Sequence, residues 1–179
     1  MNQTFHSTTI VGVKRNGKIV LAGDGQVTMG ESVVFKNKAV KVRRVYDSKI
    51  VIGFAGSAAD SFALSGKFEE MLHKYSGNLM RAAVELATLW RTDKMLRQLN
   101  AMMIVADKEQ MLLLSGTGDV IEPDEDVIAI GSGGNFALAA ARAMMKKTKL
   151  TAKEIATEAI MIAGEICCFT NQNITIEEV

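Results

Sequence analysis

The sequence is poor in the residues on which many enzymes and secreted proteins depend. Its only cysteines, Cys167 and Cys168, are adjacent. Adjacent cysteines rarely reach disulfide geometry, so no disulfide framework is expected and a reducing compartment, the cytoplasm, is favoured. The only histidines are His6 and His73, which are too few for a zinc site and leave a Ser-His-Asp arrangement little to work with.

Long apolar runs and prolines are also scarce. No run approaches the roughly 18 apolar residues of a membrane helix, and residues 1–7 lack the apolar segment of a signal peptide. The single proline, Pro123, argues against a disordered or linker-rich chain. With 21 basic and 20 acidic residues the net charge is +1, which requires neither nucleic acid nor an anionic membrane as a partner.

Apolar residues make up 48% of the chain, enough for the core of one domain over residues 8–179. Runs bounded by turn residues predict strands at 8–13, 18–22, 32–35, 39–46, 49–56, 101–106, 111–115, 127–130 and 173–177, with a polar turn at 26–30. Helical spacing predicts four helices: one ending near 75 with Ser57 as cap, one at 79–90 capped by Asn78, one at 135–147, and one after the capping box of Thr151 and Glu154. This order favours an α+β fold in which two antiparallel sheets pack together and each carries a helix pair on its outer face.

Thr8 heads the first hairpin strand, before the turn at Asn16-Gly17. If residues 1–7 are a short pro-segment that is removed, the α-amine of Thr8 lies next to its own hydroxyl. An α-amine has a pKa near 8, so at neutral pH it can take the hydroxyl proton and make the oxygen a nucleophile. A disordered end is the alternative for residues 1–7, and Thr4 and Ser7 are rival starts.

Asp24 and Lys41 are candidates to support such a nucleophile. Asp24 follows the hairpin partner of the Thr8 strand, and Lys41 lies within the strand predicted at 39–46, on the opposite side from Val40 and Val42. A buried ammonium lowers the pKa of neighbouring groups, and a carboxylate holds it in place. From the sequence alone a turn-forming role for Asp24 is equally common, and a solvated strand lysine is the more common role for Lys41.

Two glycine-containing junctions complete the candidates. Gly56 lies between a strand and a helix, where its amide suits an oxyanion; a glycine needed only for the turn is the commoner case. The run 131–134 could cradle a phosphate or present the Ser132 hydroxyl to a neighbouring site, but it lacks the Gly-Lys-Ser/Thr of a P-loop. Cys167 and Cys168 are expected in the core.

Taken together, residues 8–179 resemble the HslV (ClpQ) family of bacterial proteasome-like threonine peptidases. The similar stretches are 8–11, 22–28, 41–44, 53–56, 82–87, 90–93, 129–134, 163–167, 170–171 and 176–178. The resemblance implies an N-terminal-nucleophile hydrolase, a four-layer αββα sandwich of the proteasome β-subunit type. By position it implies Thr8 as nucleophile, Asp24 and Lys41 as the charged pair, Gly56 as oxyanion donor and Ser132 as an auxiliary serine.

The resemblance also implies partners and an ion. It implies a cytoplasmic double ring of two hexamers, a homo-oligomer whose active sites face inward, and the HslU (ClpY) AAA+ ATPase hexamer that unfolds substrates and uses the ATP. It further implies a sodium ion bound by backbone oxygens at Gly164, Cys167 and Thr170, with no organic cofactor. Two other functions are weighed against this one: a catalytically silent ring subunit of the same fold, and a small-molecule enzyme using residues 131–134 for phosphate.

Overall fold

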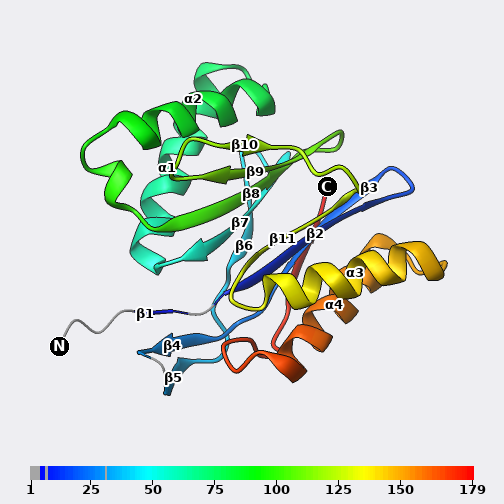
Figure 1. Cartoon of the computed structure of the whole chain (residues 1–179). Coiled ribbons are helices and arrows are strands. Elements are labelled where there is room, and N and C mark those ends of the chain that lie inside the picture. Colours follow the sequence, from blue (N-terminus) through cyan, green and yellow to red (C-terminus); the bar gives the residue numbers. More distant parts are fainter. Residues whose placement is uncertain (1–4, 7, 31) are drawn as a thin grey trace.

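The computed structural model describes residues 5–6, 8–30 and 32–179. Its main body has four layers, with two antiparallel sheets in the middle and a pair of helices on each outer face (Figure 1). Helices α1 and α2 cover one sheet and α3 and α4 cover the other, so the expected αββα sandwich is confirmed. The expected pro-segment at residues 1–7 falls mostly outside the described residues.

The sheet that carries the candidate nucleophile has the order β11-β2-β3-β12. Its elements are β2 (Thr9–Arg15), β3 (Lys18–Gly23), β11 (Val127–Gly131) and β12 (Thr175–Glu178). The predicted hairpin turn is confirmed, because Asn16 and Gly17 both have positive φ, 54° and 75°, as a tight hairpin requires.

The second sheet has the order β10-β9-β8-β7-β6. Its elements are β6 (Val42–Val45), β7 (Ile50–Gly56), β8 (Ala101–Ala106), β9 (Met111–Ser115) and β10 (Val120–Ile121), with a short 3-10 helix η1 (Leu96–Gln98) before β8. The strand predicted at 39–46 begins only at Val42. Residues 37–41 before it form no strand, and the amide of Ala39 donates to the carbonyl of Gly25.

All four helices lie where the sequence predicts them, and their caps are formed. The helices are α1 (Ala58–Lys74), α2 (Leu79–Thr92), α3 (Gly134–Lys147) and α4 (Ala152–Ile166). Ser57 and Asn78 accept hydrogen bonds from the amides three residues on, and Thr151 with Glu154 forms the predicted capping box. Each cap satisfies an amide that the helix itself leaves unpaired.

Three apolar clusters fill the spaces between the four layers. Phe68 and Trp90 pack between the α1–α2 pair and its sheet, and Ile155 packs between α4 and the other sheet. Successive residues of β2 serve different clusters: Ile10 faces the second sheet and Val11 faces the helices. A strand that is buried on both faces is fixed in register, so the residue just before it is fixed too.

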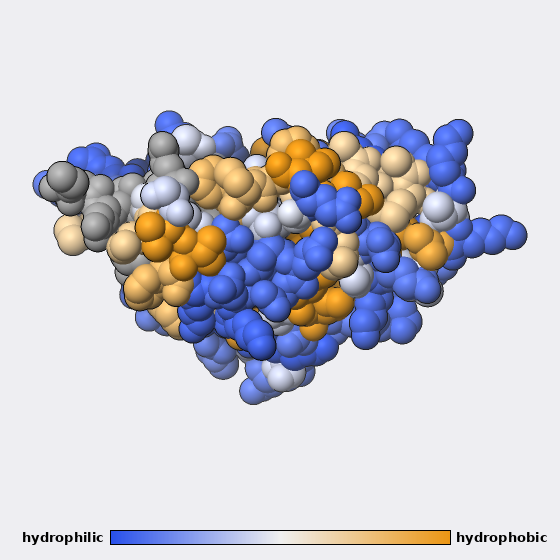
Figure 2. All heavy atoms as spheres, turned by 90° about the horizontal axis from the view of Figure 1, so that it is seen from below, coloured by the Kyte–Doolittle hydropathy of each residue, from blue (hydrophilic) through white to orange (hydrophobic). Residues whose placement is uncertain are grey.

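A small third sheet projects below the sandwich, with the order β1-β4-β5. It consists of β1 (Phe5–His6), β4 (Val27–Met29) and β5 (Val33–Lys36). The prediction of a polar turn over 26–30 is therefore wrong: β4 is too short for alternation to show. The three apolar residues of β5 are about half exposed or more, at Val33, Val34 and Phe35, and Figure 2 shows apolar patches among polar ones on this side of the molecule.

In the described ranges, no helix is long and apolar enough to cross a membrane.

Candidate active site

Thr8 lies immediately before β2 and is only 5% exposed. Its carbonyl accepts a hydrogen bond from the amide of Ser132 at 2.8 Å. The loop after β11 can lie this close because Gly131 has no side chain: a Cβ there would be 1.9 Å from the Thr8 carbonyl oxygen and 3.4 Å from the Cβ of Ala55. Thr8, the loop with Ser132 and the end of β7 therefore meet at one place.

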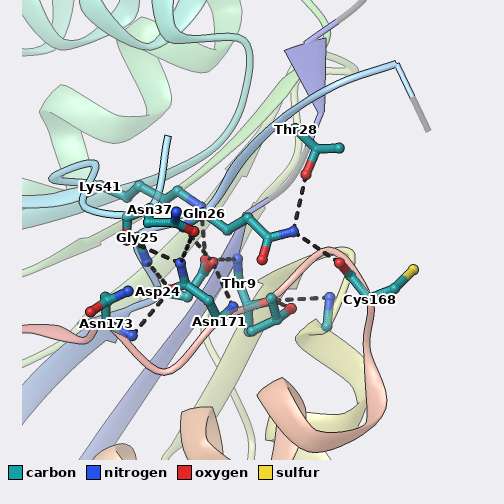
Figure 3. A network of polar contacts seen from close by, with 12 residues as sticks. Thr9, Asp24, Gly25, Gln26, Thr28, Asn37, Lys41, Cys168, Asn171 and Asn173 are labelled. Carbon is teal, nitrogen blue, oxygen red and sulfur yellow. Dashed lines mark hydrogen bonds and ion pairs between the residues drawn. The ribbon is translucent and has the colours of Figure 1, made fainter. Parts of the chain in front are cut away.

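Asp24 is fully buried directly after β3. Its Oδ1 accepts from the amide of Thr9 and from Lys41 Nζ, both at 2.8 Å, and its Oδ2 accepts from the amides of Gln26 at 2.9 Å and Asn171 at 3.3 Å (Figure 3). A role in the turn alone would not bring a buried cation to this carboxylate. One oxygen of Asp24 thus joins the ammonium of Lys41 to the residue that follows Thr8.

Lys41 is the cationic partner in this pair, with a side chain only 8% exposed. The alternative of a solvated strand lysine is therefore wrong. The alternation used to place Lys41 does not hold either, because β6 begins at Val42, which is buried, while Val40 is 71% exposed. Burial lowers the pKa of the Lys41 ammonium, and the charge and hydrogen bond of Asp24 oppose that shift.

A second set of polar contacts beside Thr8 was not anticipated from the sequence. Thr9 Oγ1 accepts from the amide of Gly133 at 2.9 Å and lies 2.7 Å from Thr170 Oγ1. The signal was present, since a threonine at a buried strand position needs a hydrogen-bond partner. The amides of Ser132 and Gly133 are thus used inside the protein, which argues against the 131–134 loop as a phosphate cradle.

The remaining predicted catalytic residues lie near Thr8 in the fold. Gly56 ends β7 next to the cap of α1, with a φ of +142°, and a Cβ there would be 2.7 Å from the Asn100 carbonyl oxygen. Its amide thus precedes a helix N-terminus, as predicted. Ser132 is exposed beside Thr8. The oxyanion role of Gly56 and the auxiliary role of Ser132 stay predictions.

The three predicted cation-binding residues lie where α4 ends. Gly164 is in the last turn of the helix, Cys167 caps it, and the amide of Thr170 donates to the Cys167 carbonyl at 3.0 Å. Carbonyl oxygens at a helix C-terminus carry partial negative charge, which suits a hard cation. Across residues 5–6, 8–30 and 32–179, no three His, Cys, Asp or Glu side chains are grouped as a metal site.

Cys167, Cys168 and His73 lie in three different surroundings. Cys167 is buried as expected, but the expectation fails for Cys168, which is exposed; its carbonyl accepts from Gln26 Nε2 at 2.9 Å. His73 lies in the last turn of α1, with its ring 5.0 Å from that of Tyr46 in an edge-on contact. Neither thiol nor imidazole is among the hydrogen-bond partners of Asp24 described above.

Known proteins resemble this chain over nearly its full length. Residues 4–179 match the family described as proteasome subunit. The ATP-dependent protease subunit HslV of Enterococcus faecalis is 61% identical over 176 residues, covering 97% of both chains, and that of Staphylococcus carnosus is 58% identical over 178 residues, covering 99% of both. The chain belongs to the HslV group of the proteasome subunit family.

A solved structure of the same group agrees with this assignment. The crystal structure of eukaryotic HslV from Trypanosoma brucei has a TM-score of 0.91 and 47% sequence identity, with 95% of this chain and 98% of that chain covered. The fold is that of an N-terminal-nucleophile hydrolase, and the chain is a proteolytic subunit, a peptidase of the threonine type. Within this family fold, the Asp24–Lys41 pair lies beside the first residues of β2.

Proposed function

We propose that Thr8, freed from residues 1–7, is the nucleophile that cleaves peptide bonds of unfolded proteins. The observation that carries the proposal is the shared oxygen of Asp24, which holds Lys41 Nζ and the amide of Thr9 at 2.8 Å each. A buried cation is thereby tied to the residue after Thr8. The combination needs no histidine and no thiol, in keeping with the surroundings of His73 and Cys168.

The reaction follows from these groups. The neutral α-amine takes the proton of the Thr8 hydroxyl, and Oγ1 attacks the peptide carbonyl. The amide of Gly56 donates to the oxyanion that forms, and the ammonium of Lys41 favours the negative charge developing nearby. The proton passes to the leaving amine, which leaves an ester on Thr8. Water activated by the same α-amine then hydrolyses the ester and restores the hydroxyl.

Assembly and partners are part of the proposal. The relatives are named as subunits of an ATP-dependent protease, which supports a multi-subunit assembly with a separate ATPase. We assign the chain to a double ring of two hexamers in the cytoplasm and the ATPase to the HslU (ClpY) hexamer. The 131–134 loop is not free to bind the phosphates of ATP, because the amides of Ser132 and Gly133 are used inside the protein. We therefore assign the ATP-driven delivery of unfolded chains to that partner.

Sodium is proposed as the resident ion. The backbone carbonyls of Gly164, Cys167 and Thr170 would hold it at the end of α4. When bound, it would neutralise the partial negative charge of that helix end and stabilise the loop that carries Thr170. Thr170 in turn contacts Thr9, so the loop helps to orient the start of β2.

The test combines mass and activity. The chain is purified, its intact mass and N-terminal sequence are determined, and peptide hydrolysis is measured with and without the ATPase and ATP. We expect loss of residues 1–7, Thr8 at the N-terminus, and hydrolysis that rises strongly when the ATPase and ATP are present. Fully active protein that starts at Met1 or Ser7 would disprove the role of Thr8. A Thr8→Ala variant that assembles but hydrolyses nothing is the expected control.

A further inference from the structure

Lys41 lies just outside strand β6, and the proposed function depends on its position. It precedes β6, and the residues from Asn37 to Lys41 form no strand. Two main-chain hydrogen bonds connect this segment to its surroundings. The amide of Ala39 donates to the Gly25 carbonyl at 2.9 Å, and the Lys41 carbonyl accepts from the amide of Phe54 at 3.2 Å.

Asn171 supplies a further link, although it lies 134 residues from Asn37 in the sequence. Its Nδ2 donates to the carbonyl of Asn37 at 3.0 Å. Its Oδ1 accepts from the amides of Gly25 and Asn173, each at 3.1 Å. Its own amide donates to Asp24 Oδ2 at 3.3 Å. Figure 3 shows the Asn171 side chain between the Asp24 turn and the segment that leads to Lys41.

The two ends of the ion pair are therefore connected through one side chain. The oxygen of Asn171 holds the turn that carries Asp24, and its nitrogen holds the segment that carries Lys41. An amide can do both at once because it has a donor and an acceptor on adjacent atoms. The turn and the segment also approach closely, since a Cβ on Gly25 would be 2.5 Å from the Asn37 carbonyl oxygen.

We propose that Asn171 is a positioning residue for the Asp24–Lys41 pair and that turnover depends on its bridge between the Gly25 amide and the Asn37 carbonyl. This inference rests on the proposed function of Lys41. Asn171 itself touches no reacting atom. It acts by holding the Lys41 segment against the Asp24 turn, so that the ammonium stays at the carboxylate.

The experiment compares Asn171→Ala with Asn173→Ala in the full, processed chain with its ATPase partner. Asn173 is the matched control, because it lies two residues on, is exposed, and takes part in the bridge only through its main-chain amide, which alanine keeps. We expect Asn171→Ala to lower kcat roughly ten- to hundredfold, as misplacement of a catalytic group by about 1 Å can, with KM nearly unchanged. Asn173→Ala keeps the wild-type kcat.

A serine at position 171 separates the local turn with Asn173 from the bridge to Asn37. Its hydroxyl can still accept from the Asn173 amide in a local turn, but it is too short to reach the Asn37 carbonyl. We expect Asn171→Ser to lose nearly as much kcat as Asn171→Ala. If Asn171→Ser has the wild-type kcat, the local turn suffices and the bridge to Asn37 has no role.

A double-mutant cycle distinguishes positioning from a general structural defect. If Asn171 acts through Lys41, adding Asn171→Ala to Lys41→Ala costs much less than it does in the wild type. Equal costs in both backgrounds would overturn the inference, as would wild-type kcat for Asn171→Ala alongside an inactive Lys41→Ala. A processed wild-type chain that hydrolyses no peptide with the ATPase and ATP would overturn the proposed function and this inference together.

Discussion

At the residue scale, the carboxylate of Asp24 holds together the main-chain amides of the site and pairs with its buried cation, Lys41. It accepts four hydrogen bonds and has no exposed surface, so its carboxylate is satisfied without water. A buried ion pair is costly when one partner is removed, because the other charge is left unpaired. Variants of this pair are therefore informative about function only when assembly is measured with activity.

Removing either charge of the pair should abolish most of the activity. Lys41→Ala deletes the cation that Asp24 ties to the residue after Thr8, and Asp24→Asn leaves the cation without its carboxylate partner. We expect peptide hydrolysis to fall about 10²-fold or more, as is typical when a preorganised electrostatic group is lost. Near-normal turnover of Lys41→Ala in an intact assembly would rule out the assigned role.

The pH dependence of hydrolysis should report Lys41. The cation is the active form, so the rate falls as pH rises through the pKa of Lys41, which burial places below the usual lysine range. In Asp24→Asn the opposing charge is gone and that pKa drops further. The alkaline limb of the profile, normalised to each variant's own maximum, should therefore shift to lower pH. Asp124→Asn, the same change on the exposed loop before β11, is the control and should leave the limb in place.

Part of this site could be predicted from the sequence and part could not. Asp24, Lys41 and Gly56 were named as candidates, but residue chemistry alone left Asp24 with an equally common structural role and Lys41 and Gly56 with a commoner one. Thr9 and Asn171 were missed as parts of the network because their partners, Thr170 and Asp24, lie 161 and 147 residues away. No local pattern encodes which distant polar groups meet in a folded core.

At the element scale, long periodic segments were predicted well and short ones were not. The four helices and the central strands have caps, turns or alternation that act locally. By contrast, β4 and β10 have three and two residues, too few for a period to appear, and they form only because a neighbouring strand is present. Lys41 was placed in a predicted strand for a related reason. Apolar residues also precede the first residue of β6, so the pattern does not show where the strand begins.

The capping box of α4 gives a stability prediction. In Thr151→Ala the helix loses the hydroxyl that accepts from the Glu154 amide, at a cost of about 1 kcal/mol. That cost should lower the apparent Tm by roughly 2–4 °C in a chain of this size. Thr157→Ala makes the same chemical change within the same helix, where alanine is favourable, and should not lower Tm. Equal Tm values for the two variants would mean that the box adds no stability.

At the scale of the whole molecule, the exposed apolar side chains need an explanation that one chain does not provide. Three of them follow one another on β5, at Val33, Val34 and Phe35, and β5 is the edge of its sheet. An exposed apolar edge strand invites association, which natural proteins avoid unless the edge is covered. In a ring, each subunit contacts its neighbours through different faces, and this edge offers one such face.

Assembly is therefore the last prediction. We expect size-exclusion chromatography with light scattering to give the mass of a closed ring assembly, with weak peptidase activity that rises strongly once the ATPase ring docks and favours the competent active site. Val34→Lys, which puts a charge on the β5 edge, should shift the chain toward smaller species and lower activity with them. Ile121→Lys is the control. Ile121 is similarly exposed on β10, but the exposed acid Glu122 follows it, so we expect this variant to leave the assembly intact. A stable monomer that degrades folded proteins without ATP would contradict the assembly, and a ring unaffected by Val34→Lys would place its contacts away from β5.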